Sequence, residues 1–155
     1  MSVIDKFRLD GQVAIITGAG KGIGAGIARA FAEAGANVAI GARTVADLEK
    51  VAADVRSLGR EALVVPTDVL DSGQLEHLAN RALEHFGRID ILVNNAGGFP
   101  PKPVANTSAR EFEAAFRFNV TTAYELSRLC APLMVDTAGS GTILNISSIA
   151  GHKPA

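Results

Sequence analysis

Short apolar runs alternate with amphipathic stretches along the chain, and this alternation predicts strands and helices in turn. Strands are predicted at residues 13–17, 37–42, 61–69, 90–96 and 141–147. Each is a continuous apolar run and not an alternation of apolar and polar positions. Such runs are typical of strands buried on both faces, as in a parallel sheet that is covered by helices.

The stretches between these strands have the spacing of amphipathic helices, which are predicted at residues 22–35, 44–59, 72–87 and 108 to about 135. In the second helix one face collects apolar side chains, namely Leu48, Val51, Ala52, Val55 and Leu58. Gly35, Gly59 and Gly87 suit helix C-termini. N-terminal caps are expected from Asp71, from Thr44 with Asp47, and from Ser108 with Glu111.

Parallel strands joined by helices cross over with a right-handed turn, so the predicted fold class is α/β. The expected architecture is a doubly wound parallel sheet, a Rossmann-type three-layer sandwich. No linker, repeat or low-complexity segment interrupts it. Residues 1–155 are therefore interpreted as one domain, or as one piece of a domain.

Composition narrows the range of functions. The 155 residues are 48% hydrophobic and 20% charged, with a formal net charge of −1, which gives no reason to expect nucleic acid or an anionic membrane as partner. No apolar run reaches the ~18 residues of a membrane span, and the opening "MSVIDKFRLDG" lacks a signal-peptide core. His77, His85 and His152 lack metal-ligand spacing, so no metal site is expected. The lone Cys130 favours core packing and a reducing, cytoplasmic location.

A glycine-rich turn, "TGAGKGIGAG" at residues 17–26, lies between the first strand and the first helix. Gly18, Gly22 and Gly24 provide a tight turn, a close backbone approach for a pyrophosphate and close helix packing. Glycines also serve ordinary turns, but this position favours a dinucleotide cradle, which would include Thr17, Lys21 and Ile23. The phosphate-loop pattern G-x-x-x-x-G-K-[ST] is absent.

The end of the second strand predicts which dinucleotide binds. A carboxylate at that place would bind the ribose 2′-hydroxyl of NAD(H), but the sequence has Ala42 followed by Arg43. The Arg43 guanidinium and the Lys21 ammonium suit a 2′-phosphate. Both cations could also be solvated surface residues. Together they favour NADP(H), with NAD(H) as the less favoured cofactor.

Several motifs occur in an order that resembles the classical short-chain dehydrogenase/reductases: "TGAGKGIG", "TDV" at 67–69, "NNAG" at 94–97, "FNV" at 118–120 and "NISSIAG" at 145–151. The resemblance implies that Asp68 and Val69 lie by the adenine. It also implies that Asn95, Ala96 and Gly97, after Asn94, close the cofactor cleft. The alternative interpretation is that both segments are ordinary turns, and "NNAG" could serve both purposes.

The resemblance also assigns catalytic roles. Ser148 would polarise a substrate carbonyl, with Ser147 facing away, and Asn119 would anchor a water in a proton relay. Local turn chemistry and local hydrogen bonding are the alternatives for these residues. The family's Y-x-x-x-K pair is missing, because the only tyrosine, Tyr124, is followed four positions later by Arg128.

The expected function is therefore that of an NADP(H)-dependent oxidoreductase that interconverts a secondary alcohol and a ketone. The segments "FRLDG", "GGFPPKPV" and "APLM" are similar to bacterial hydroxysteroid dehydrogenases and 3-oxoacyl-carrier-protein reductases. The chain would be the N-terminal portion of a longer enzyme that carries the Tyr and Lys. Two alternatives are a cofactor-binding module without that pair and a truncation product.

Two surfaces are expected to need covering. The fifth strand would be interior in the family's sheet, with C-terminal strands and helices beyond it that this chain lacks. The helix from residue 108 carries more apolar side chains than one sheet can bury. In the family the corresponding helix forms a subunit interface, which implies a homodimer or homotetramer. Simple core packing is the alternative.

Overall fold

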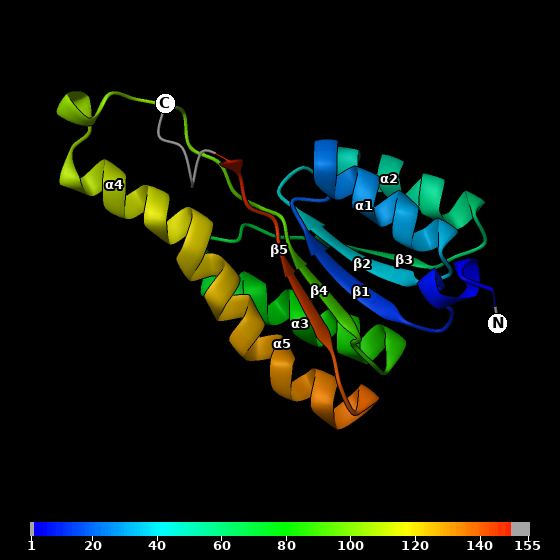
Figure 1. The fold of residues 1–155 in the computed structure, drawn as a ribbon. Coiled ribbons are helices and arrows are strands. Elements are labelled where there is room, and N and C mark those ends of the chain that lie inside the picture. The colour runs from blue at the N-terminus through cyan, green and yellow to red at the C-terminus, as the bar shows by residue number, and fades with distance from the viewer. Residues whose placement is uncertain (1, 150–155) are drawn as a thin grey trace.

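The strands of the computed structural model, which describes residues 2–149, form one sheet in the order β3-β2-β1-β4-β5 (Figure 1). All paired neighbours are parallel. The strands are β1 (Val13–Thr17), β2 (Asn37–Ala42), β3 (Ala62–Pro66), β4 (Ile91–Asn94) and β5 (Thr142–Asn145). The strand order reverses at β1, which has β2 on one side and β4 on the other. The predicted doubly wound α/β sheet is confirmed.

Helices cover both faces of this sheet, which gives the predicted three layers (Figure 1). One face carries α1 (Gly22–Glu33) and α2 (Val45–Ser57), and the other carries α3 (Ser72–Phe86) and α5 (Thr122–Ala138). The remaining elements are α4 (Ala109–Phe116), a π-helical segment η3 (Arg117–Thr121) and two 3-10 turns, η1 (Ile4–Phe7) and η2 (Val104–Asn106). No helix within residues 2–149 is long and apolar enough to cross a membrane.

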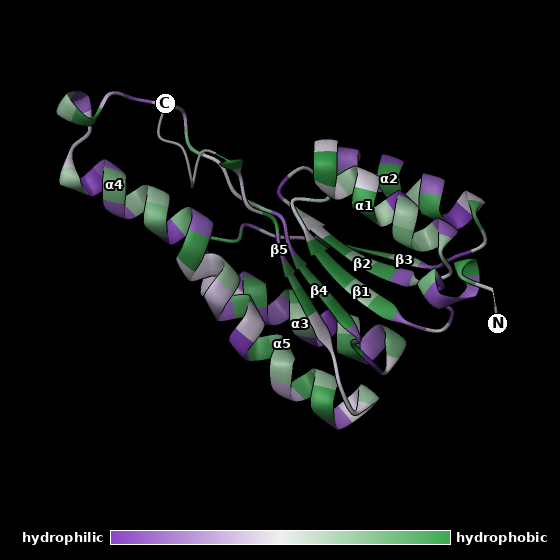
Figure 2. Cartoon of the chain, viewed as in Figure 1, coloured by the Kyte–Doolittle hydropathy of each residue, from purple (hydrophilic) through white to green (hydrophobic). Residues whose placement is uncertain are grey.

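Successive residues of the central strands feed two separate cores. Ile16 packs with α1 and α2, whereas Ile15 packs with α3 and α5, and both are fully buried. Figure 2 shows the resulting apolar colour along β1, β2 and β4. Each fully buried side chain of this size contributes roughly 1.5–3 kcal/mol. Cys130 lies in the second core, as the sequence predicts.

Several predicted boundaries are too long. β3 ends at Pro66 and not at residue 69, because its last pairing is with Ala42, at the end of β2. β4 likewise ends at Asn94, and β5 spans only 142–145. The residues after β3 and β4 leave the sheet at its carboxyl edge. Leu58 is 43% exposed and not part of the core face, because α2 ends at Ser57.

The helix caps are confirmed with one exception. Asp71 accepts hydrogen bonds from two backbone N–H groups of α3, and Ser108 with Glu111 forms a complete capping box. The expected Thr44–Asp47 capping pair is wrong, because Thr44 makes no side-chain cap. The Asp47 carboxylate instead forms a salt bridge with Lys21.

The single helix predicted from residue 108 to about 135 is in fact three segments. α4 passes into the π-helical segment Arg117–Thr121 and then into α5, which ends at Ala138. Gly139 adopts a left-handed φ of 76° and terminates α5. A π segment frees backbone groups from the regular helical pattern and often marks a functional site.

Several large apolar side chains of the described residues are exposed to solvent. In β5, which pairs only with β4 among the described strands, Ile143 and Leu144 are 37% and 41% exposed. Exposed apolar side chains also recur at four-residue intervals from α4 to α5, at Phe112, Phe116, Val120 and Tyr124. The expectations of further strands and of a subunit interface stay predictions.

Candidate functional site

A cleft of about 440 Å³ opens at the carboxyl ends of the strands, where the order reverses at β1. Its walls come from the glycine turn, the end of β2, the segment after β3, the segment after β4 and the π segment. The lining residues are Gly18, Gly20, Lys21, Ala42, Arg43, Thr44, Asp47, Thr67, Asp68, Val69, Leu70, Ala96, Gly97 and Phe118. The cleft thus brings together many of the residues that the sequence predicts to bind the cofactor.

The glycine turn has the backbone that the sequence requires. Gly18 and Gly22 have φ values of 65° and 53°, in the left-handed region that favours glycine. A Cβ on Gly24 would lie 2.5 Å from both the Gly18 carbonyl oxygen and the Asn95 Nδ2. This close approach seats the first turn of α1 against the glycine turn. Ile23, between Gly22 and Gly24, is 65% exposed.

Thr17 fixes the glycine turn to the end of β4. Its hydroxyl donates to the Val93 carbonyl (3.4 Å) and accepts from the N–H groups of Asn95 (3.0 Å) and Ala96 (3.1 Å). The Asn95 amide donates to the Thr17 carbonyl (3.0 Å) and the Gly18 carbonyl (3.2 Å). Thr17 is buried, so Thr17 and Asn95 position the cradle from behind the cleft.

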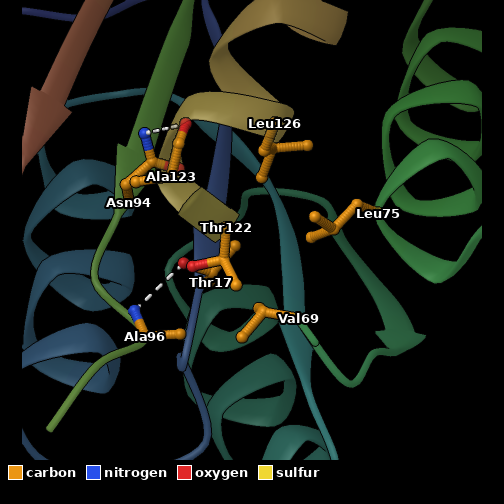
Figure 3. A pocket seen from close by; sticks show the side chains of 8 residues that line it. All are labelled: Thr17, Val69, Leu75, Asn94, Ala96, Thr122, Ala123 and Leu126. Atoms are coloured by element: carbon orange, nitrogen blue, oxygen red, sulfur yellow. Dashed lines mark hydrogen bonds between the residues drawn. The ribbon is translucent and has the colours of Figure 1, made fainter. Parts of the chain in front are cut away.

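Asn94 connects β4 with its neighbours behind the cleft. Its amide donates to the Asn145 Oδ1 (2.9 Å), the Ser127 Oγ (3.0 Å) and the Ala123 carbonyl (3.4 Å). Figure 3 shows Asn94 and Ala96 beside a hollow that leaves no space for a water molecule. This packing agrees with the idea that "NNAG" steadies the sheet, and it makes the hollow too tight for a ligand.

Charged groups gather where the cleft meets α2. The Lys21 Nζ lies 3.0 Å from the Asp47 Oδ2, and this hydrogen bond is the main reason why the pKa of Asp47 lies below its usual value. Arg43 is exposed and makes no salt bridge or hydrogen bond within residues 2–149. The Asp68 carboxylate accepts the Leu70 N–H (3.0 Å), so Asp68 both lines the cleft and forms the local turn.

Asn119 lies in the π segment and contacts the loop after β4. Its Oδ1 accepts the Gly98 N–H (2.8 Å), and its Nδ2 donates to the Ala115 carbonyl (2.8 Å) and the Gly98 carbonyl (3.3 Å). A Cβ on Gly97 would lie 2.8 Å from the Asn119 Oδ1. Asn119 thus reaches the mouth of the cleft, and its role with water stays a prediction.

Ser147 and Ser148 follow β5 by two and three residues, and both are exposed. The Ile146 N–H donates to the Asn94 carbonyl (3.0 Å), which places the start of this segment beside β4. The motif's Ala150 and Gly151, and also His152, lie outside the described residues. The orientation of Ser147 and the catalytic role of Ser148 stay predictions.

The sequence does not predict a cofactor-binding role for seven residues that line the cleft, namely Gly20, Ala42, Thr44, Asp47, Thr67, Leu70 and Phe118. The sequence instead favours a helix-capping role for Asp47 and a place on a subunit-facing helix for Phe118. The only available signal for Phe118 was its place directly before Asn119. Within residues 2–149 no group of three His, Cys, Asp or Glu side chains could hold a metal ion.

These features define a dinucleotide-binding crevice of Rossmann type. A family model described as short chain dehydrogenase matches residues 12–155, and the chain belongs to this family. Over 153 residues the chain is 45% identical to an uncharacterized oxidoreductase of Mycobacterium tuberculosis, covering 99% of this chain and 58% of that protein. Over 149 residues it is 43% identical to the 7alpha-hydroxysteroid dehydrogenase of Escherichia coli, covering 96% of this chain and 58% of that enzyme.

A solved structure of a 7 alpha-hydroxysteroid dehydrogenase, complexed with NADH and 7-oxo glycochenodeoxycholic acid, has the same fold. Its TM-score is 0.94 at 41% sequence identity, and the match covers 100% of this chain and 60% of that chain. The chain therefore spans about three fifths of the length of these relatives. The protein is similar to oxidoreductases that act on CH–OH groups with a nicotinamide cofactor.

Proposed function

We propose that the whole protein is an NADP(H)-dependent oxidoreductase that interconverts a secondary alcohol and a ketone. The observation that carries this proposal is the cleft, which is lined by Arg43 and by Lys21 of the glycine turn, while no carboxylate occupies the end of β2. The relative that is complexed with NADH supports nicotinamide dinucleotides as the ligand class. The two cations support a ligand with a 2′-phosphate.

The residues of the cleft fit such a dinucleotide. The glycine turn has no space for a side chain at Gly18, where a Cβ would lie 2.9 Å from the Asn95 Nδ2 and 3.1 Å from the Ala96 Cα. The α1 N-terminus has no side-chain cap, which leaves its first N–H groups available to a pyrophosphate. Arg43 would hold the 2′-phosphate, and Asp68 with Val69 would border the adenine.

For the chemical step, the bound cofactor supplies or accepts the hydride. The Ser148 hydroxyl would donate a hydrogen bond to the substrate carbonyl oxygen and so favour the charge that develops on it. Asn119 would hold a water in the proton relay. The proton donor would be a Tyr whose pKa is lowered by a neighbouring Lys. Both residues would lie in the part of the whole protein that corresponds to the relatives' length beyond the matched residues.

The substrate class follows from the relatives and from the loop after β4. A hydroxysteroid-like or 3-oxoacyl ketone is proposed, because one relative is a 7alpha-hydroxysteroid dehydrogenase. The loop at residues 97–104 begins at the cleft with Gly97, and its apolar Phe99 and Val104 are 43% and 92% exposed. An apolar substrate could cover these side chains.

A catalytically incomplete dinucleotide-binding module is the second candidate. This candidate predicts cofactor binding without turnover, whereas a truncation product predicts neither. A cytoplasmic location stays a prediction from the sequence.

The test uses the complete protein and measures NADPH oxidation with 7-oxo steroids and 3-oxoacyl thioesters. Turnover with either substrate class supports the enzyme, and binding without turnover supports the second candidate. Replacing Lys21 and Arg43 together by alanine should weaken NADPH binding by about tenfold or more, because each lost charge-assisted hydrogen bond reduces the binding free energy. The matched control replaces Lys6 and Arg110, two exposed cations outside the cleft. Unchanged NADPH affinity in the Lys21/Arg43 variant would contradict NADP(H) specificity.

We also propose that the protein is a homodimer or homotetramer. The support is the exposed apolar row of Phe112, Phe116, Val120 and Tyr124, which follows consecutive turns from α4 to α5. An exposed apolar row of this length is typical of a protein–protein interface. Sedimentation at micromolar concentration should show dimers or tetramers, and a monomer would defeat this proposal.

A further inference from the structure

Asp47 lies in the wall of the cofactor cleft, in the first turn of α2. Its side chain is only 16% exposed, although it carries a carboxylate. The Oδ2 atom lies 3.0 Å from the Lys21 Nζ, and the Oδ1 atom lies 3.7 Å from the Lys50 Nζ. One of the two cations expected to attract a 2′-phosphate is therefore already paired with a carboxylate.

Asp47 lies close to the glycine turn. A Cβ on Gly20, in the glycine turn, would lie 3.2 Å from the Asp47 Cβ and 3.6 Å from the Ala42 Cβ. The glycine turn, the end of β2 and the first turn of α2 are thus in van der Waals contact around Gly20. This contact places the Asp47 Cβ beside the glycine turn, and the ion pair with Lys21 directs its carboxylate toward that turn.

This placement has opposite consequences for the two cofactors. A 2′-phosphate that binds Lys21 must approach the Asp47 carboxylate, and two anions so placed repel each other. The uncharged 2′-hydroxyl of NAD(H) meets no such repulsion. Arg43 has no ionic partner within residues 2–149 and keeps its full attraction for a phosphate.

We infer that Asp47 is a specificity-determining residue that weakens the protein's preference for NADP(H) over NAD(H). It does so by occupying Lys21 and by repelling the 2′-phosphate. The inference rests on the proposed dinucleotide binding and adds to it a residue that opposes the cations. The protein should consequently accept both cofactors, with a ratio of affinities that depends on Asp47.

The experiment compares Asp47→Asn with the wild-type complete protein by calorimetric titration of NADPH and NADH. Asparagine keeps the size of the side chain and removes its charge. NADPH should bind about two- to fivefold more tightly in the variant, which is the range for one partly solvated charge interaction, and NADH should be unaffected. The gain should shrink at high salt, because salt screens the repulsion.

The matched control is Asp54→Asn, on the same helix, whose carboxylate pairs with Arg29 at 2.8 Å and does not line the cleft. It should leave both affinities unchanged. If Asp47→Asn does not fold, Asp47→Ser removes the same charge with a residue that suits a helix N-terminus.

Two results would overturn the inference, and they show whether the inference alone or also the proposed function fails. If the wild type binds both cofactors but removing the Asp47 charge leaves their ratio unchanged, or weakens NADPH binding, the inference alone fails. If the wild type binds neither cofactor, the proposed function fails and the inference with it.

Discussion

Gly24 and Gly26 offer a direct test of how tightly the phosphate cradle is built. Both lie in the first two turns of α1, two residues apart. A Cβ on Gly24 would lie 2.5 Å from the Gly18 carbonyl oxygen, 2.9 Å from the Gly18 carbonyl carbon and 2.5 Å from the Asn95 Nδ2. A Cβ on Gly26 would meet nothing within 4 Å. The same substitution by alanine therefore probes a crowded and an open position of one helix.

The expected difference in stability is obtained by comparing what alanine adds and costs at each of the two positions. Replacing a helical glycine by alanine stabilises by roughly 0.5–1 kcal/mol, and this gain applies to both positions. Overpacking against backbone that must shift costs roughly 1–3 kcal/mol, and this cost applies only to Gly24. The helix-propensity gain cancels in the comparison, so Gly24→Ala should be less stable than Gly26→Ala by about 1–3 kcal/mol.

Urea unfolding followed by far-ultraviolet circular dichroism would measure this difference in the complete protein, and an NADPH titration would accompany it. Gly24→Ala should also weaken NADPH binding, because its Cβ displaces the Gly18 turn that approaches the phosphates. Gly26→Ala should bind NADPH like the wild type. Equal stabilities and equal affinities for the two variants would refute the reasoning.

Three further predictions concern single side chains. Thr17→Val deprives the N–H groups of Asn95 and Ala96 of their acceptor and should destabilise by about 2–3 kcal/mol in urea unfolding, whereas Thr17→Ser should retain most of the stability. Burial raises the pKa of the Cys130 thiol to about 12, so thiol reagents at mildly alkaline pH should react with it only after unfolding; rapid labelling of the native protein would contradict this. The hydrogen bond from Lys102, with those from Ser108, lowers the pKa of Glu111 to about 2. Its stabilising effect is present above the ordinary value of 4.5 and is lost as the pH falls through about 2, so Glu111→Gln should flatten the acid dependence of stability in that window.

The fold was predictable because each strand is a continuous apolar run and each helix has a clear period. β1 and β2 begin and end as expected, and the capping box at Ser108 and Glu111 is visible in the sequence alone. The glycine turn was predictable for a different reason. Gly18 and Gly22 have left-handed φ values, and glycine is the residue that suits them.

Other features depend on tertiary contacts that no local pattern encodes. The π segment Arg117–Thr121 has no sequence signature of its own, and the interval from 108 to 135 reads as one helix. The end of β3 at Pro66 is set by its pairing with Ala42, at the end of β2. Asp47 has capping spacing from Thr44, but its partner Lys21 lies 26 residues earlier in the chain, across the glycine turn.

The most direct test is one calorimetric comparison of NADPH and NADH binding to the complete protein. If the cleft at the glycine turn binds a dinucleotide and Arg43 holds the 2′-phosphate, both cofactors should bind once per chain, with NADPH the tighter of the two. No saturable binding, or tighter binding of NADH than of NADPH, would contradict the proposed site.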